Sequence, residues 1–378
     1  MMRPEVKDQI DSFTTVVNRC LAKRKILGRL RANLARNERD HEDRALWRED
    51  AGMGVPAVMV SESLGGVGLG ISAMGQVAEL YGRHMSGGVF LSTACLSLPV
   101  LVRSHGEARD KAIRDIVSGS AIVCVALPTS AQIAKGELPF SASCTQGGEW
   151  HISGRSAPVV DADIADFIIV PASSRQGDVW FLADCSHFTR ERAGVTMDGG
   201  GAAIIALDDE LPAEARLCMP GEGVVLAEAA LIQGAALISA WLLGLAEKAF
   251  DMTLSHLKTR KQFGVHIGSF QALQHRMAAL YCDLAVGRSV VERALQAIDE
   301  GDLRSPLFAS AAKARMGALA YKITNEAIQM HGAIGLTEEA DISFYLKGSR
   351  LADLMAGHHY CHGNRARVLL LGASGARL

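Results

Sequence analysis

The chain has 378 residues, about twice the length of a typical single domain, and 49% of them are hydrophobic, so it can bury a large apolar core. Its net charge is -2 and its lysines and arginines form no long run, which argues against a nucleic-acid-binding surface. The eight cysteines are scattered without CxxC pairs, and no signal peptide is evident, so we expect reduced thiols and a cytoplasmic protein.

The chain divides into three regions by the spacing of its apolar residues. Residues 1–119 show helical spacing and predict an α-helical domain. Residues 120–221 contain short apolar runs between Gly, Ser and Asp turns, which predict a small β-domain. In residues 222–378 the helical spacing returns and predicts an antiparallel four-helix bundle. Its four helices are expected near 225–257, 269–299, 308–332 and 348–371.

The most apolar stretch of the sequence, Val224–Ala246, is about long enough to span a bilayer. It carries Glu228 and Gln233 together with many small residues. A buried bundle helix is therefore the favoured interpretation, and no membrane span is expected.

Two strings in the predicted bundle carry a resemblance to a known family. Arg260-Lys-Gln-Phe-Gly264 is followed by Phe270-Gln271, and Gln329-Met-His-Gly-Ala-Ile-Gly-Leu-Thr337 follows further on. In order and spacing they resemble the R-x-x-F-G, F-Q and Q-x-x-G-G-x-G signatures of the acyl-CoA dehydrogenase family, with Ala333 in place of the second glycine. Weaker matches in the first two regions extend the resemblance over nearly the whole chain.

This resemblance implies an α+β, mainly α fold, with an N-terminal helical domain, a middle β-barrel-like domain and a C-terminal four-helix bundle. It also implies FAD as the cofactor, contacted across a dimer interface. Arginine suits the pyrophosphate because its planar guanidinium donates two parallel hydrogen bonds. The matching cofactor-binding residues are Arg260, Phe263, Gly264, Gln271, Gln329, Gly332 and Gly335.

The family's chemistry requires a carboxylate base that removes the α-proton of an acyl-CoA while a hydride leaves for the flavin. The usual position of that glutamate falls on Ala356, with His358 at the position of the following threonine. An alternative position, on the first bundle helix, falls on Gly234. Neither residue accepts a proton, so no catalytic residue is expected on this chain. Glu228 and Glu247, on the same helix, are interpreted as structural.

The pocket for the chain's own flavin also departs from the family pattern. Ala157-Pro-Val-Val-Asp161 replaces the family's Trp-Ile-Thr strand, and the proline removes a backbone donor. The loop before it offers only Thr129 and Ser130 as weak candidates for substrate binding. The residues that would contact the FAD of a neighbouring subunit thus match the family, whereas those that would form the chain's own flavin pocket do not.

This asymmetry resembles the base-lacking subunit of the α2β2 heterotetramers known from bacterial steroid side-chain catabolism. The resemblance implies a homologous partner subunit that supplies the catalytic glutamate and a bulky, ring-bearing acyl-CoA substrate. It also implies an electron-transfer flavoprotein as the electron acceptor.

The run His358-His359-Tyr360-Cys361-His362 leaves alternatives open. A metal site is not favoured, because four tetrahedral ligands rarely come from five consecutive residues and no second ligand group is apparent. A homomeric enzyme, similar to a desulfinase or a lyase, could use His358 or His359 as its base. The third alternative is a non-enzymatic scaffold with the dehydrogenase fold.

Overall fold

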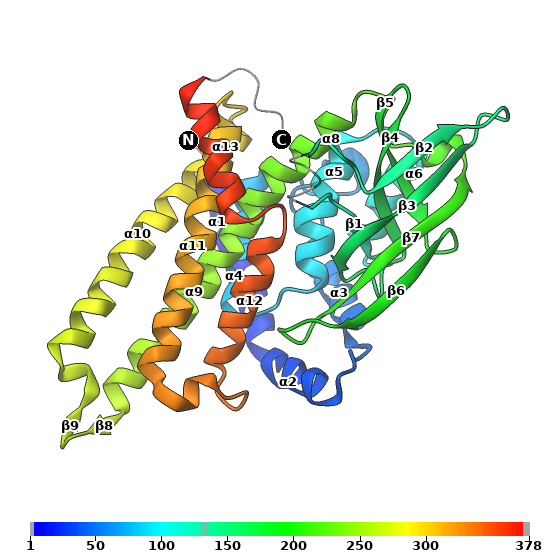
Figure 1. Cartoon of the computed structure of the whole chain (residues 1–378). Helices are drawn as coiled ribbons and strands as arrows, with labels where there is room; N and C mark the ends of the chain where they lie inside the picture. The colour runs from blue at the N-terminus through cyan, green and yellow to red at the C-terminus, as the bar shows by residue number, and fades with distance from the viewer. Residues whose placement is uncertain (1–3, 130–131, 133–134, 373–378) are drawn as a thin grey trace. The chain divides into compact units, whose positions relative to one another are not determined.

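The computed structural model describes residues 4–129, 132 and 135–372 (Figure 1). The chain folds into two compact units. The helical unit comprises the chain up to Arg31, Gly75–Gly87 and Ala235–Leu370, and the mixed unit comprises Ala32–Met74 and Gly88–Gly234. The division into three domains at residues 119 and 221 stays a prediction.

The helical unit is built around long helices of the last third of the chain, joined by helices from the N-terminal region. Pro306 lies in the first turn of α11, where its missing N–H is not needed. Helix α11 packs against α9, α10 and α12, so it lies at the centre of the bundle. The helices are α1 (Pro4–Lys23), α4 (Gly70–Arg83, from Gly75 on), α9 (Ala235–Thr259), α10 (Gln271–Asp299), α11 (Ser305–His331), α12 (Ile342–Leu354) and α13 (His359–Leu371).

Two glycines bring the backbones of α4 and α9 into direct contact. A Cβ atom on Gly82 would overlap the carbonyl oxygen of Trp241, and one on Gly244 would overlap the carbonyl oxygen of Glu79. Because each helix contributes one glycine opposite a carbonyl of the other, any larger residue at either position would force the helices apart.

The prediction of one helix over 348–371 is wrong. The structure has two helices there, α12 and α13, because the chain turns at Ala356 and Gly357, whose φ angles are 54° and 97°. These left-handed conformations cannot continue an α-helix. The predicted helix over 225–257 is also interrupted, since α8 (Gly223–Ala229) and α9 are separated by the π-helical turn η4 (Ala230–Gly234).

The mixed unit contains a seven-stranded sheet among the described residues, in the order β1-β4-β2-β3-β7-β6, with β5 paired to β4. Strand β4 runs parallel to β1 and β2, and the other pairings are antiparallel. The strands are β1 (Val123–Val125), β2 (Phe140–Cys144), β3 (Trp150–Val160), β4 (Phe167–Ser174), β5 (Gly177–Asp184), β6 (Phe188–Val195) and β7 (Gly201–Leu211).

Helical segments of the mixed unit pack with this sheet and with one another. The π-helical segment η2 contacts both β1 and η4, so the regions before and after the sheet meet. The segments are α3 (Glu42–Gly52), η1 (Glu62–Leu64), η2 (Phe90–Ser97), α5 (Leu98–Arg103), α6 (Glu107–Val117), η3 (Ala213–Ala215) and α8; α2 (Ile26–Arg36) joins the two units along the chain.

A buried ion cluster ties the start of the mixed unit to its sheet. The Arg39 guanidinium donates to Asp43, Asp161 and Asp163 at 2.7, 2.7 and 2.8 Å. Arg39 thereby joins the segment before α3 to the turn after β3. Asp161 is completely buried, and burial raises its pKa to about 6 although the charge of Arg39 opposes this shift. One guanidinium therefore faces more carboxylate charge than it can neutralise.

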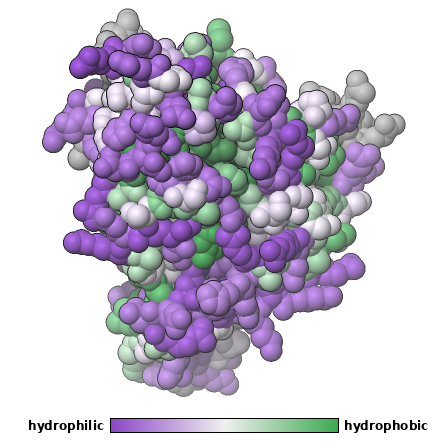
Figure 2. Space-filling view, turned by 90° about the vertical axis from the view of Figure 1, so that its right-hand side faces the viewer, coloured by the Kyte–Doolittle hydropathy of each residue, from purple (hydrophilic) through white to green (hydrophobic). Residues whose placement is uncertain are grey.

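Hydrophobic residues fill the interiors of both units, and three tryptophans, Trp47, Trp180 and Trp241, are among the largest buried side chains. Figure 2 shows that hydrophilic residues cover most of one face, with hydrophobic atoms visible between them. One described helical run, Gly223–Thr259, is long and apolar enough to cross a membrane, but 83% of its most apolar window is buried inside the protein. This burial agrees with the prediction of a core helix.

We predict that Asp161→Asn stabilises the protein at pH 7.5. The folded pKa of Asp161, about 6, lies above its unfolded value, so ionisation destabilises the fold as the pH rises through this range. The difference corresponds to at most about 3 kcal/mol, and asparagine avoids it while accepting the bond from Arg39. Asparagine also tolerates the φ of 62° at this position. Urea unfolding between pH 4 and 8 measures the effect.

Asp163→Asn is the matched control, because it removes a carboxylate charge from the rim of the same cluster, where the side chain is 12% exposed. This variant should gain no stability, since it loses an ion pair that solvent already screens in part. If Asp161→Asn unfolds more easily than the wild type at pH 7.5, ionised Asp161 stabilises the fold and our explanation is wrong.

Candidate cofactor-binding and active-site residues

The two strings predicted to bind the cofactor lie at the same end of the helical unit (Figure 1). The first leaves α9 at Arg260 and forms the hairpin β8 (Lys261–Gln262) and β9 (Val265–His266), followed by η5 (Ile267–Ser269) and α10. The second ends α11 and forms η6 (Gly332–Leu336). The imidazole rings of His256 and His331, from the last turns of α9 and α11, stack with their centroids 4.3 Å apart. The fold thus brings together strings that are distant in the sequence.

The hairpin between β8 and β9 has a two-residue turn formed by Phe263 and Gly264, with φ angles of 52° and 81°. Positive φ at both central residues is the pattern of a type I′ turn, which explains the glycine. The turn leaves the Phe263 ring 90% exposed, edge-on to the ring of Phe270 at a centroid distance of 6.3 Å. A large aromatic side chain in this position is available for contact with another molecule.

The other predicted cofactor-binding residues are also mostly exposed. Arg260, Gln271, Gln329 and Gly332 face solvent, and the Arg260 side chain makes no hydrogen bond or ion pair with another described residue. Gly335 is buried, and a Cβ there would lie 2.9 Å from the carbonyl oxygen of Ile328. The end of the bundle therefore presents an exposed guanidinium that makes no ion pair within the described residues, which fits a pyrophosphate group.

Ala356, at the predicted base position, lies in the turn between α12 and α13 and is buried. Its carbonyl oxygen is 2.7 Å from Nε2 of His362. Burial lowers the pKa of His362 to about 4, so this imidazole is neutral and donates to the carbonyl. Neither Ala356 nor the buried His362 is placed as a proton acceptor for a substrate.

Gly234, at the alternative base position, has no room for a side chain. A Cβ there would lie 2.8 Å from Cδ2 of Leu96 and 3.2 Å from the carbonyl oxygen of Cys95. Glu247 forms ion pairs with Arg83 at 3.0 Å and with Arg288 at 2.6 Å, and Glu228 is exposed on α8. The ion pairs of Glu247 are consistent with its predicted structural role.

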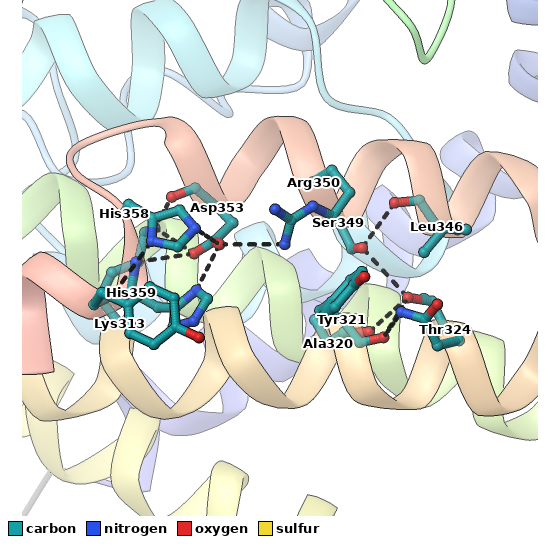
Figure 3. Close-up of polar contacts among 12 residues, drawn as sticks. Lys313, Ala320, Tyr321, Thr324, Leu346, Ser349, Arg350, Asp353, His358 and His359 are labelled. Carbon is teal, nitrogen blue, oxygen red and sulfur yellow. Dashed lines mark hydrogen bonds and ion pairs between the residues drawn. The ribbon is translucent and has the colours of Figure 1, made fainter. Parts of the chain in front are cut away.

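The run of residues from His358 to His362 does not converge on one point. His358 and His359 turn toward Asp353, His362 points to the carbonyl of Ala356, and Tyr360 is 73% exposed. Sequence reasoning found no second ligand group for these histidines, and the structure corrects this by supplying Asp353. Figure 3 shows the carboxylate of Asp353 between the two imidazoles and Lys313.

Lys313 is a fully buried lysine on α11 that holds the turn after α12. Its Nζ donates to the carbonyl oxygens of Asp353 at 2.7 Å and Gly357 at 2.9 Å, and lies 3.5 Å from Oδ1 of Asp353. Burial lowers the pKa of Lys313 to about 8, although the charge of Asp353 opposes this shift. Asp353 is also buried, yet Lys313 and the histidines hold its pKa below the ordinary value. The carboxylate is therefore ionised at neutral pH.

The strand that contains Pro158 carries an irregularity just before the proline. The register between β3 and β7 shifts between Arg155 and Pro158, and the hydroxyl of Ser156 accepts the N–H of Ile205 at 2.9 Å. The Thr129 hydroxyl donates to Oε1 of Gln132 at 3.0 Å, so it is used within its own loop. Ser130, the other candidate for substrate binding, lies outside the described residues.

Two family models and a relative of known family match this chain. Residues 19–120 match the model of the acyl-CoA dehydrogenase N-terminal domain, and residues 221–365 match that of the C-terminal domain. "Acyl-CoA dehydrogenase IpdE2" of Mycobacterium tuberculosis is 31% identical over 310 residues, which cover 81% of this chain and 80% of that protein.

Solved structures share the fold over almost the full length. The "Tcur3481-Tcur3483 steroid ACAD G363A variant" has a TM-score of 0.86 and 24% identity, covering 98% of this chain and 100% of that one. The ChsE4-ChsE5 complex from Mycobacterium tuberculosis has a TM-score of 0.80 and 23% identity, covering 100% and 99%. Other structures with this fold are complexes with FAD or FADH2. By its two domain matches and its relative at 31% identity, the chain belongs to the acyl-CoA dehydrogenase family.

Proposed function

We propose that this chain is one subunit of an FAD-dependent acyl-CoA dehydrogenase, in which it completes the FAD site of a homologous partner that supplies the catalytic glutamate. The proposal rests on the contrast between the residues suited to the cofactor and the residues at the two base positions. Side chains suited to the cofactor are exposed at the end of the helical unit, whereas both base positions hold residues without an acidic group, Ala356 and Gly234.

Each part of this division of labour follows from the chemistry of the residues. Bound FAD supplies the acceptor for the hydride that leaves the β-carbon of the acyl-CoA. Arg260 would bind the pyrophosphate through its guanidinium, and Phe263 would cover the cofactor from the hairpin turn. Gly332 is exposed and would let the backbone approach the cofactor closely, because it carries no side chain. The buried Gly335 would let η6 pack against the carbonyl of Ile328. The α-proton would pass to the partner's carboxylate.

The finer parts of the proposal concern substrate and assembly. We infer an α2β2 heterotetramer acting on a bulky steroid side-chain CoA thioester, because structures with this fold include a steroid enzyme and a complex of two differently named chains. We further propose an electron-transfer flavoprotein as the acceptor and a cytoplasmic location for the assembly. These inferences rest on the similarity to solved structures, whereas the absence of a glutamate at positions 234 and 356 is a property of this sequence.

A second candidate function is a homomeric enzyme that uses His358 or His359 as its base. The observation in its favour is the 2.7 Å contact between Nδ1 of His359 and Oδ2 of Asp353. A carboxylate in this position fixes the tautomer and the orientation of an imidazole, as in many catalytic His–Asp pairs. A scaffold without enzymatic activity is the third possibility that an experiment must separate.

Coexpression separates the three functions. We expect the chain purified alone to be colourless, and the complex with the product of a neighbouring acyl-CoA dehydrogenase gene to be yellow with bound FAD. The absorbance spectrum and the stoichiometry of subunits measure both results. A yellow homomer that an acyl-CoA bleaches would instead establish the homomeric enzyme, and a colourless homomer that forms no complex would establish the scaffold.

We predict that Arg260→Ala weakens FAD retention by the complex by about 10- to 150-fold, because a hydrogen bond to a charged group contributes about 1.5 to 3 kcal/mol. Flavin content after dialysis against increasing volumes measures the loss. Lys258→Ala is the matched control, since it removes an equal charge from an exposed position in the last turn of α9. Equal flavin retention in both variants would exclude Arg260 from the cofactor site.

We predict that replacing both His358 and His359 by alanine leaves turnover by the complex within about tenfold of the wild type, because the proton goes to a carboxylate on the partner. Steady-state rates with a panel of acyl-CoA thioesters measure this. A loss of several orders of magnitude, with assembly and flavin content unchanged, would place the base on this chain and favour the second candidate function.

A further inference from the structure

Asp353, His358 and His359 bring three potential ligand atoms together at the junction of α12 and α13. Oδ2 of Asp353 lies 2.7 Å from Nδ1 of His359 and 3.1 Å from Nε2 of His358. One ligand atom from each of the three residues lies within 4.8 Å of the other two. We propose that these residues bind a divalent transition-metal ion, with zinc as the ion that fits the donor set best.

The carboxylate is held so that one oxygen faces the imidazoles. Its other oxygen, Oδ1, accepts the backbone N–H of His359 at 3.2 Å and lies 3.5 Å from Nζ of Lys313. This leaves Oδ2 directed toward the two ring nitrogens, as Figure 3 shows. Contacts of this kind around a ligand fix its orientation and are a regular part of metal sites.

Hydrogen bonds also hold the backbone turn between α12 and α13. Lys313 donates to the carbonyl oxygens of Asp353 and Gly357, one on each side of the turn, so the start of α13 is held against the end of α12. The left-handed φ of 54° at Ala356 reverses the chain between these two contacts. Two neighbouring histidines can therefore reach one carboxylate oxygen without a change of fold. An ion that enters here replaces the two hydrogen bonds to Oδ2, and each imidazole then carries its proton on its other ring nitrogen.

An ion can reach the site from solvent. The side chain of His358 is 23% exposed and that of His359 is 12% exposed, whereas that of Asp353 is 1% exposed. Three protein ligands on one side of an ion leave a position that water can fill, which is the arrangement of an open zinc site. His362 is not a ligand, because its Nε2 is already used at the carbonyl of Ala356.

The surrounding charges determine which metals can bind. Lys313 and Arg350, whose Nη1 is 3.8 Å from Oδ2, already offset the negative charge of Asp353. The binding free energy must therefore come mainly from the imidazole nitrogens. Mg²⁺ and Ca²⁺ prefer oxygen ligands and gain little here, whereas Zn²⁺ binds imidazole well.

Zinc titration of the tag-free full-length chain tests the site. We expect isothermal titration calorimetry to show one zinc ion per chain, and metal analysis after dialysis to confirm this ratio. His358→Gln and His359→Gln should each weaken binding by at least about tenfold, since changes around a metal ligand alone have effects of 10- to 100-fold. His275→Gln, at an exposed position on α10, is the control and should bind zinc as the wild type does.

Thermal unfolding provides a second readout that is independent of calorimetry. Zinc should raise the Tm of the wild type and of His275→Gln but not that of the double variant at His358 and His359, because only a native-state ligand stabilises the fold. Mg²⁺ at the same concentration should leave every Tm unchanged. Absence of stoichiometric zinc binding by the wild type, or equal affinity in the double variant, would overturn the proposal. Neither result depends on flavin or on a partner subunit, so the proposed function is tested separately.

Discussion

A single buried ammonium group determines the architecture at the end of α12. Lys313 is inaccessible to solvent, and an unpaired charge in that position would destabilise the fold by several kcal/mol. It is satisfied only if the chain turns at Ala356 and Gly357 and presents two carbonyl oxygens together with the carboxylate of Asp353. The break between α12 and α13, which also places the histidines, thus supplies the groups that satisfy the charge of Lys313.

That turn also explains why the fold accommodates alanine at position 356. Ala356 contributes a carbonyl to His362 and a left-handed backbone to the turn, and neither contribution needs a side chain beyond Cβ. The position can thus lack a base while Lys313 and His362 maintain the backbone around it. At the other end of the bundle, the side chains of Arg260 and Phe263 are exposed, although their backbones take part in the segment around the hairpin turn.

The elements that could be predicted are those that depend on the pattern of residues close together in the sequence. The bundle helices near 269–299 and 308–332 were predicted from the spacing of their apolar residues, and α10 and α11 confirm them. The hairpin after α9 was not predicted, although Phe263 and Gly264 at its turn lie in a string that carries the family resemblance. The single helix over 348–371 was wrong, because apolar spacing continues through Ala356 although its backbone conformation does not. That error concealed Asp353, which approaches His358 only once the chain has turned.

Contacts between distant segments were beyond sequence reasoning. Nothing in the neighbourhood of Arg39 indicates that it will bind Asp161 and Asp163, which follow a strand far along the chain. Lys313 likewise lies mid-helix in an Ala-rich segment, where a lysine is ordinarily solvated. Each of these charges is identified as buried only by the three-dimensional packing.

The paired glycines of α4 and α9 have a consequence for how the helical unit folds. With Gly82 against Trp241 and Gly244 against Glu79, a slip of one residue would drive a Cβ into a carbonyl, so only one docking register is open to these helices. The two helices are separated in the chain by Gly88–Gly234, the larger segment of the mixed unit. Such a contact closes a very long loop and forms slowly compared with local helices. The docking of α4 onto α9 is therefore expected to follow the packing of α9 against α10, α11 and α12, and newly made chains would expose the surface of α9 that faces α4 until it is complete.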